Sequence, residues 1–157
     1  MSDGGRWSHR LTELGIELPE AVPPAAVYVP AVRTGSHVYV SGQLPMVNGK
    51  LPATGKVGAE VDPEDAKRYL RTCALNALAA VASVTGGLDA IRRIVKVTGF
   101  VASAPDFTQQ AQVINGASEL LTEVFGDAGR HARSAVGLAV LPLDAPVEVE
   151  LIAEVTA

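Results

Sequence analysis

The sequence predicts an α+β fold in which two long helices pack on one face of a mixed β-sheet. Two segments, residues 62–85 and 106–125, repeat apolar side chains at the i, i+3, i+4, i+7 spacing of a helix with one buried face. Short β-branched segments precede, separate and follow them, and clusters of Gly and Pro divide one segment from the next. The length of 157 residues fits one domain, residues 1–157, with an N-terminal extension over residues 1–26.

The first third of the chain predicts a short helix and then a β-hairpin. Residues 7–14 form the helix, Gly15 ends it, and the Pro-rich residues 17–26 are extended. Strands over residues 28–32 and 37–41 follow, joined by a turn at residues 33–36. Residues 46–61 are irregular, with room for a short strand near residues 47–51.

The remaining elements alternate helix and strand before they end in strands. Asp62 and Pro63 are typical of a helix start, and Gly86 follows the last apolar turn. A strand over residues 94–102 comes next, and Asp106 with Gln109 predicts a capping box at the start of the second long helix. Residues 135–141 and 147–155 predict a terminal hairpin.

Several strands are apolar on both faces. For example, Val38 and Val40 point to one face of their strand and Tyr39 points to the other. Two helices cover one face of a sheet, so the other face is expected to meet a neighbouring subunit. The sequence therefore predicts an oligomer.

Composition argues against several classes of function. The net charge of −4 and the scattered Lys and Arg residues give no basic stripe for a nucleic acid. The N-terminus lacks the apolar core of a signal peptide, and no apolar run approaches the roughly 20 residues of a membrane span. The single cysteine, Cys73, favours a cytoplasmic protein and is expected to be a small buried side chain. The three histidines have no metal-ligand spacing, so no metal is expected, and the Gly-rich segments lack the P-loop and dinucleotide-binding patterns.

The segment from His131 to Glu154 carries the strongest chemical signal. Arg133 precedes an apolar strand, and Glu148 and Glu150 alternate with apolar residues in the next one. A guanidinium binds a carboxylate through two parallel hydrogen bonds, so a cation and two carboxylates on adjoining strands suit a small anionic substrate that reacts with water. The alternatives are a surface arginine paired with a glutamate and the solvated face of an edge strand.

Four other residues are candidates for contact with the same ligand. Gly42, after Ser41, leaves its backbone N–H open to a ligand, or it simply ends a strand. Tyr28 can stack on a ligand or fill the core. Asn115 is unfavourable inside a helix, which indicates a hydrogen-bonding role or exposure to solvent.

With these motifs in order, the chain from about Tyr28 to its C-terminus resembles the Rid family of reactive-intermediate deaminases, also called the YjgF family. The resemblance is carried by Val40-Ser41-Gly42-Gln43-Leu44-Pro45, by Arg133-Ser134-Ala135-Val136, and by Leu141-Pro142 with the segment from Val147 to Ala153. The extra N-terminal helix is similar to that of a subgroup with longer chains.

The resemblance implies a chorismate-mutase-like fold and a homotrimer whose sheets form a central barrel, with three clefts between subunits. It implies hydrolysis of 2-imino acids, the tautomers of enamines such as 2-aminoacrylate, to 2-keto acids and ammonia without a cofactor. Arg133 then binds the substrate carboxylate and Glu150 positions the water, while Tyr28, Ser41, Gly42 and Asn115 line the cleft. The chain departs from the family pattern at Ala135, where cysteine is common, so the pocket and the substrate preference are expected to differ.

Three alternatives stay open on the same residues. The first is a non-catalytic trimer that binds small carboxylates such as 2-keto acids. The second is another hydrolase, acting on an amide-type substrate, and the third is a ribonuclease or translation inhibitor, which the acidic balance disfavours.

Overall fold

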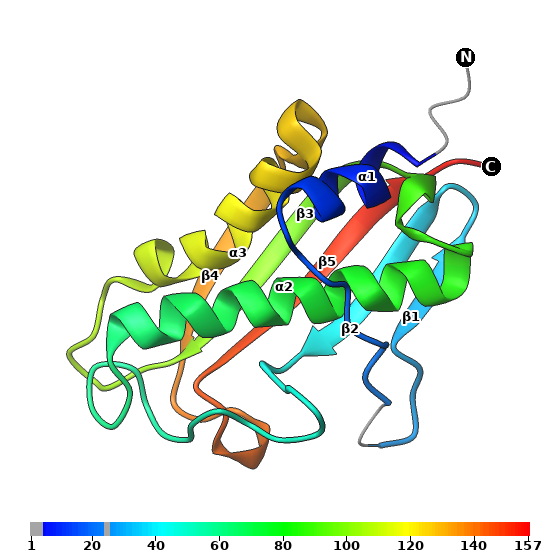
Figure 1. Cartoon of the computed structure of the whole chain (residues 1–157). Helices are drawn as coiled ribbons and strands as arrows, with labels where there is room; N and C mark the ends of the chain where they lie inside the picture. The colour runs from blue at the N-terminus through cyan, green and yellow to red at the C-terminus, as the bar shows by residue number, and fades with distance from the viewer. Residues whose placement is uncertain (1–4, 24–25) are drawn as a thin grey trace.

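Within the part of the chain that the structure describes, five strands form one mixed sheet in the order β1-β2-β5-β3-β4. The structure is a computed structural model that describes residues 5–23 and 26–157 (Figure 1). The strands are β1 (Ala31–Thr34), β2 (His37–Gln43), β3 (Ile91–Ala102), β4 (Ala132–Leu138) and β5 (Val147–Val155). The helices are α1 (Arg6–Glu13), α2 (Pro63–Thr85) and α3 (Gln110–Phe125), and 3-10 turns occupy Leu88–Ala90, Gly126–Gly129 and Pro142–Asp144.

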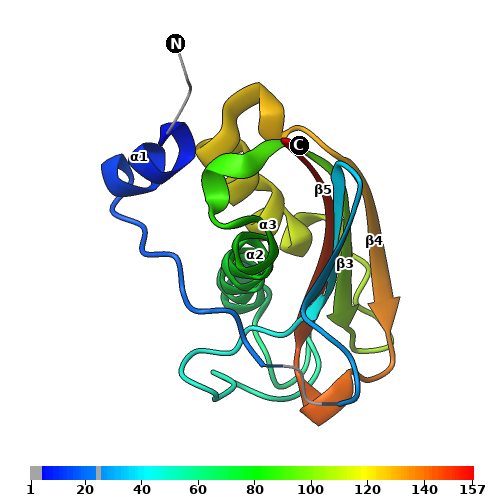
Figure 2. The same cartoon turned by 90° about the vertical axis from the view of Figure 1, so that its right-hand side faces the viewer.

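The three helices lie on one face of the sheet, as the edge-on view in Figure 2 shows. The predicted α+β architecture is therefore confirmed. The core fills the space between the two layers with aliphatic side chains that are almost wholly excluded from solvent. Its largest members include Val38, Val97 and Val101 from the sheet and Leu70, Leu78, Ile114 and Leu121 from α2 and α3.

Helix α2 begins and ends where its sequence predicts. The Asp62 carboxylate accepts a hydrogen bond from the Glu64 backbone N–H at 2.8 Å, and Pro63 occupies the first turn. Gly86 ends the helix in the left-handed conformation, with φ of 85°. The buried Asn76 on α2 donates to the carbonyl oxygens of Leu44 and Met46, which anchors the loop that follows β2.

The N-terminal hairpin is confirmed, although its first strand lies further along the chain than expected. Strand β1 spans Ala31–Thr34, and the turn is reduced to Gly35 and Ser36, with Gly35 at φ of 58°. Tyr28 therefore precedes the sheet. Strand β2 continues to Gln43 through a β-bulge, and the expected strand near residues 47–51 is one isolated bridge between Val47 and Lys50.

The predicted capping box of the second long helix is wrong. Helix α3 begins at Gln110, and Gln109 at its N-cap forms no side-chain capping hydrogen bond. Residues 104–107 instead form a turn closed by the Phe107 N–H and the Ala104 carbonyl. The Gln110 side-chain amide donates to the Phe107 carbonyl at 2.9 Å. A side chain at the start of α3 therefore supplies the hydrogen bond that this carbonyl needs.

The predicted terminal hairpin is also wrong, because β4 and β5 do not pair. Strand β3 lies between them, parallel to β4 and antiparallel to β5. The segment β3-α3-β4 is a βαβ unit, whose crossover helix makes its two strands parallel. The chain then passes through the 3-10 turn Pro142–Asp144 and returns as β5 on the other side of β3, between β3 and β2.

Trp7 is a main anchor of helix α1 to the rest of the fold. The Trp7 indole N–H donates to the Ile91 carbonyl at 2.7 Å, and its ring meets Phe125 edge to face with centroids 5.0 Å apart. The Asp89 carboxylate accepts from the backbone N–H groups of Trp7 and Ser8 at the start of the helix. The predicted short N-terminal helix is therefore confirmed.

No helix covers the second face of the sheet in the described residues (Figure 2). This open face carries exposed apolar groups, including Val32 and Tyr39 on the hairpin. Phe100, Val136 and Ile152, which alternate with residues facing the helices, are only partly buried. The expectation of a sheet with two apolar faces and helices on one is confirmed.

Candidate functional site

Arg133 lies on the edge strand β4, on the side of the sheet that faces α3. It pairs in register with Val97, whose side chain is in the core. Its Nη1 group donates to Asn115 Oδ1 at 2.7 Å and to Ser118 Oγ at 3.2 Å, and Nη2 donates to the Ala111 carbonyl at 3.2 Å. The structure thus brings the predicted residues Arg133 and Asn115 together, and it explains an asparagine inside a helix.

The contacts of Arg133 leave part of its guanidinium available to a ligand. The three hydrogen bonds to α3 use both N–H groups of Nη1 and one of Nη2. Of the five donors of an arginine, Nε–H and one N–H of Nη2 remain for a second acceptor. Two such donors suit the two oxygens of a carboxylate.

Two small residues, Ala135 and Gly137, follow Arg133 on the helix-facing side of β4. Ala135 follows on the same face of β4, and it is exposed, as is Ala111 on α3. At Gly137, two residues further on, a side chain would meet the amide of Gln110. Ala135 therefore follows Arg133 on the helix-facing side of the edge strand with a side chain no larger than a methyl group.

Ser118 and His131 belong to the same cluster, although sequence reasoning did not select them. His131 Nε2 lies 2.9 Å from Ser118 Oγ, and its Nδ1 lies 2.6 Å from the Gly129 carbonyl. Only spacing in the sequence could have indicated them. Ser118 follows Asn115 by three residues and so shares its face of the helix, and His131 precedes Arg133 by two residues and so points to the same side of the extended chain.

The predicted residues Tyr28, Ser41 and Gly42 gather in a second group, where β2 ends. The Ser41 hydroxyl donates to the Val29 carbonyl at 2.6 Å, and the Ser41 N–H donates to the Pro30 carbonyl at 2.8 Å. Tyr28 and Gly42 line the same small cavity, of about 80 Å³. The β-bulge within β2 turns the backbone of Gly42 out of the regular ladder.

Glu148, rather than Glu150, is the acidic residue at this second group. A side chain at Gly42 would overlap the Glu148 carboxylate, so the absence of one is what admits that carboxylate. Glu148 is half-buried; burial raises the pKa of its carboxyl group, and the charge of Glu150 raises this pKa further. Glu150 is exposed and lines a different depression, with Tyr39, Lys96 and Thr98.

Arg133 and Glu150 do not lie on adjoining strands, contrary to the expectation from the sequence. Thr98 of β3 pairs with Ser134 on one side and with Glu150 on the other, so β3 separates them. Their side chains also leave opposite faces of the sheet: Arg133 contacts α3, whereas Glu150 alternates with the buried residues Val149 and Leu151. The expected hairpin was the source of this error.

Neither the Cys73 thiol nor a metal centre is a candidate for the chemistry of this site. Cys73 is fully buried on α2, and burial raises the pKa of its thiol well above the ordinary value. In residues 5–23 and 26–157 no group of three or more His, Cys, Asp or Glu side chains is arranged to hold a metal ion. None of the helices described is both long and apolar enough to cross a membrane.

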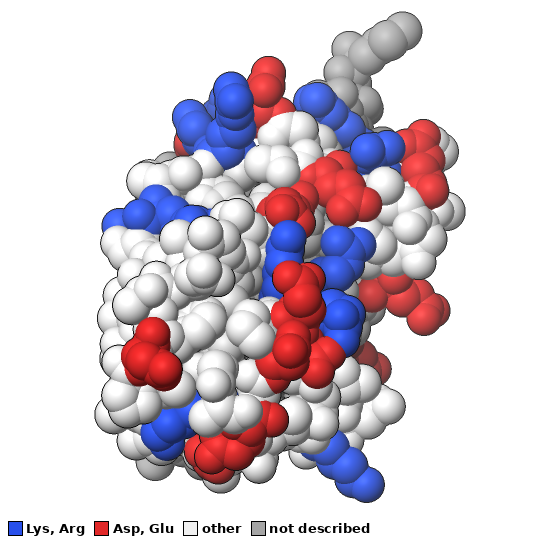
Figure 3. All heavy atoms as spheres, turned by 90° about the vertical axis from the view of Figure 1, so that its left-hand side faces the viewer, with Lys and Arg blue, Asp and Glu red and all other residues white. Residues whose placement is uncertain are grey.

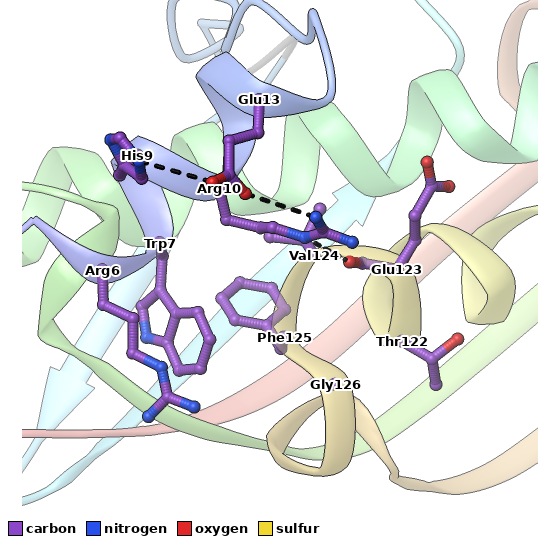
Figure 4. Close-up of a pocket in the computed structure, with 10 residues that line it drawn as sticks. All are labelled: Arg6, Trp7, His9, Arg10, Glu13, Thr122, Glu123, Val124, Phe125 and Gly126. Carbon is purple, nitrogen blue, oxygen red and sulfur yellow. Dashed lines mark hydrogen bonds and ion pairs between the residues drawn. The ribbon is translucent and has the colours of Figure 1, made fainter.

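A separate cavity of about 410 Å³ lies between α1 and the end of α3 (Figure 4). Its polar side chains largely contact one another: Glu13 pairs with His9 at 3.4 Å and with Arg10 at 3.3 Å, and Arg10 also donates to the Glu123 carbonyl at 3.2 Å. None of the residues predicted for the site lines it. We interpret these contacts as the docking of the N-terminal helix.

On the side of the molecule shown in Figure 3, Lys and Arg side chains are interspersed with Asp and Glu side chains over one half, and much of the other half is uncharged. Ion pairs between α2 and α3 contribute to this pattern, with Lys67–Glu119 and Arg71–Glu123 both at 3.2 Å. A surface of this kind lacks the continuous positive charge that phosphate backbones require. This face therefore gives no support to a nucleic-acid function.

Comparisons with known proteins place the chain among its relatives. Residues 8–155 match the family described as "YjgF/chorismate_mutase-like, putative endoribonuclease". Protein TCP17 of Trypanosoma cruzi is 44% identical over 151 residues, which cover 96% of this chain and 94% of TCP17. "Putative reactive intermediate deaminase TdcF" of Escherichia coli is 34% identical over 137 residues, which cover 86% of this chain and 89% of TdcF.

Solved structures agree with this placement. The crystal structure of Atu1372 from Agrobacterium tumefaciens, a protein described as of unknown function, has a TM-score of 0.87 at 50% identity and covers 96% of this chain and 92% of its own. The crystal structure of E. coli TdcF with bound serine has a TM-score of 0.62 at 29% identity, covering 87% of this chain and 94% of its own. The chain has the chorismate-mutase-like α+β fold and belongs to the YjgF/RidA family, also called the Rid family.

Proposed function

We propose that the protein hydrolyses 2-imino acids, and the enamines that tautomerise to them, to 2-keto acids and ammonia. The observation that carries the proposal is the Arg133 guanidinium, which α3 holds in place while two of its N–H groups stay available. Two properties of the relative TdcF agree with it: its name refers to a reactive intermediate deaminase, and its crystal structure contains serine, which has a carboxylate.

In the proposed mechanism, Arg133 holds the substrate carboxylate and Glu148 acts on the water. A carboxylate that is half-buried, with a raised pKa, is suited to accept a proton near neutral pH. As the water oxygen bonds to the imine carbon, its proton passes to Glu148 and the C=N electron pair moves to nitrogen. The nitrogen takes this proton back from Glu148, which gives the carbinolamine. The hydroxyl proton of the carbinolamine then passes to the nitrogen as the C–N bond breaks, so that ammonia leaves and the oxygen forms the C=O group of the 2-keto acid.

Glu148 takes the role that the sequence assigned to Glu150. Only Glu148 lies against Gly42, the backbone that is proposed to contact the ligand. Glu150 is proposed to act on Glu148 through its charge. Tyr28 and Ser41 shape the pocket at the end of β2, and Asn115 and Ala135 shape the part around Arg133.

We further propose that each site forms between two subunits of a homotrimer. In one chain the Arg133 group faces α3 and the Glu148 group lies across β3 from it, so neither group alone supplies both the anion-binding and the water-activating side chain. The open apolar face of the sheet and the edge strand β4 are surfaces on which a second copy would bury apolar area.

Steady-state turnover of 2-iminobutyrate, measured as the 2-oxobutyrate formed, tests the activity. We expect the protein to accelerate hydrolysis well above the spontaneous rate. If the protein binds 2-oxobutyrate but does not accelerate hydrolysis, the proposed activity is wrong and the protein is a carboxylate-binding protein.

A mixing experiment tests the position of the site between subunits. Arg133→Ala and Glu148→Gln chains are each expected to be inactive, but when they are unfolded and refolded together some clefts receive both intact residues. For random assembly of equal amounts, about a quarter of the clefts should be restored. Activity that stays at the level of the separate variants would place the whole site within one chain.

A further inference from the structure

The Arg133 guanidinium is one end of a continuous hydrogen-bond chain that leads away from the proposed site. Arg133 Nη1 donates to Ser118 Oγ at 3.2 Å, Ser118 Oγ lies 2.9 Å from His131 Nε2, and His131 Nδ1 lies 2.6 Å from the Gly129 carbonyl. The chain joins β4, α3 and the 3-10 turn Gly126–Gly129, three elements that bound this edge of the molecule.

The two ends of the chain fix the direction of its outer bonds, and the protonation state of His131 fixes the bond between them. A guanidinium N–H can only donate and a backbone carbonyl can only accept, so His131 Nδ1 carries a hydrogen. The neutral ring then has its lone pair on Nε2, which accepts the Ser118 hydroxyl hydrogen. The lone pairs of Ser118 Oγ therefore face Arg133, and the uncharged form of His131 is the one that completes the chain.

The surroundings of His131 favour the neutral ring. Burial lowers its pKa, the Gly129 carbonyl opposes this, and the charge of Arg133 lowers the pKa further. On α3 the neighbouring Glu119 pairs with Lys67 at 3.2 Å, and on β3 Arg93 donates to the Arg130 carbonyl at 3.3 Å. Among the residues described, no carboxylate forms an ion pair with His131.

We propose that Ser118 and His131 are positioning residues for carboxylate binding, which fix the orientation of the Arg133 guanidinium through this chain. The proposal rests on the role of Arg133 proposed above. A guanidinium held by Asn115, Ala111 and Ser118 presents its two remaining N–H groups in one direction. Protonation of His131 places a hydrogen on Nε2, turns the Ser118 hydroxyl hydrogen away, and leaves two cations bonded to one oxygen. Substrate binding is therefore sensitive to the protonation of a residue that does not touch the substrate.

Substitutions at the two positions test the chain as a unit. Ser118→Ala and His131→Phe are each expected to raise KM for 2-iminobutyrate and Kd for 2-oxobutyrate about tenfold, because a guanidinium hydrogen bond of this kind contributes about one decade. The kcat value is expected to change less than about threefold. The double variant should be no worse than either single one, since both break one chain. His131→Gln, whose amide oxygen can accept from Ser118, should recover part of the affinity.

The pH profile separates positioning from a general loss of structure. Because the pKa of His131 is lowered, wild-type KM is expected to rise as the pH falls through and below the ordinary histidine pKa of 6.5, whereas KM of His131→Phe stays high and flat. Matched controls are Ser83→Ala, which removes an exposed serine whose hydroxyl donates to the Ala80 carbonyl, and His9→Gln, which replaces an exposed histidine. Both should keep the wild-type KM and pH profile.

The outcomes distinguish this inference from the proposed function. If Arg133→Ala abolishes binding of 2-oxobutyrate while Ser118→Ala and His131→Phe retain wild-type KM and profile, the positioning role is wrong and the carboxylate site stands. Effects of the two single variants that multiply in the double variant also contradict a single chain. If Arg133→Ala itself binds 2-oxobutyrate normally, the proposed function is wrong.

Discussion

The Glu148 carboxylate occupies the space in which any other residue at position 42 would carry its β-carbon. Gly42 lies in the β-bulge at the end of β2, and Glu148 comes from the neighbouring strand β5. A half-buried carboxylate is thereby packed against backbone that is itself partly buried, and burial raises the pKa of that carboxyl group. The missing side chain at position 42 thus determines where the proposed general base lies.

Gly42→Ala should displace Glu148 and reduce catalysis much more than it reduces stability. A displacement of about 1 Å at a reacting group costs roughly a hundredfold in rate, so kcat for 2-iminobutyrate is expected to fall by about that factor. Gly35→Ala is the matched control, since a side chain at this turn glycine meets no atom within 4 Å, although its φ of 58° makes the change mildly destabilising. Wild-type kcat in Gly42→Ala would contradict the assigned role of this contact.

Glu148→Gln and Glu150→Gln should differ in kind. Loss of the proposed base is expected to lower kcat by about 10²- to 10⁴-fold, whereas loss of Glu150 should change it less than about threefold. The negative charge of Glu150 raises the Glu148 pKa, so its removal should move the acidic limb of the pH–kcat/KM profile to lower pH. Steady-state kinetics of the two variants over a range of pH measure both effects. If Glu150→Gln loses more kcat than Glu148→Gln, Glu150 is the general base.

A charge on the open face of the sheet should prevent assembly without unfolding the chain. Tyr39 is 48% exposed on β2, so Tyr39→Glu should shift the mass measured by light scattering from trimer to monomer and abolish turnover. Val84→Glu, at a position 37% exposed on α2, is a control that should leave the mass unchanged. If Tyr39→Glu still forms a trimer, the open face of the sheet is not the interface between subunits.

His131 should make the folded protein less stable in acid. Its pKa is lower in the folded chain than the ordinary 6.5, so the unfolded chain takes up the proton first as the pH falls. The free energy of unfolding should therefore fall through and below the ordinary histidine range, with no such contribution above it. Urea titrations at several pH values should show a smaller decline for His131→Phe than for wild type, with the exposed His9→Gln as control; equal slopes would refute this assignment.

Local sequence signals predicted the helices and strands well but not every neighbour within the sheet. The Asp62–Pro63 start and the Gly86 end of α2 depend on nearby backbone groups, and both are where the sequence places them. The pairing of β4 with β3 depends on the crossover through α3. Alternation of apolar residues predicts that a segment is a strand, but it does not indicate which strand it pairs with. The expected terminal hairpin failed for this reason.

The site was predictable to a similar extent. Arg133, Asn115, Tyr28, Ser41 and Gly42 were selected from residue type and from family resemblance, and the structure arranges them in two groups. Spacing could not decide between Glu148 and Glu150, because both point to the same face of β5 and only the bulge at Gly42 distinguishes them. Ser118 and His131 were missed since serine and histidine have many ordinary roles and their partnership with Arg133 spans three elements.

The most direct test is the turnover of 2-iminobutyrate by Arg133→Ala and Arg133→Lys, measured beside wild type with the assembly mass checked for each. Lysine keeps the charge but lacks the planar fork, so we expect a large rise in KM with Lys and loss of detectable turnover with Ala, in trimers that remain folded. Wild-type kcat/KM in Arg133→Ala would contradict the central claim that this guanidinium binds the substrate carboxylate.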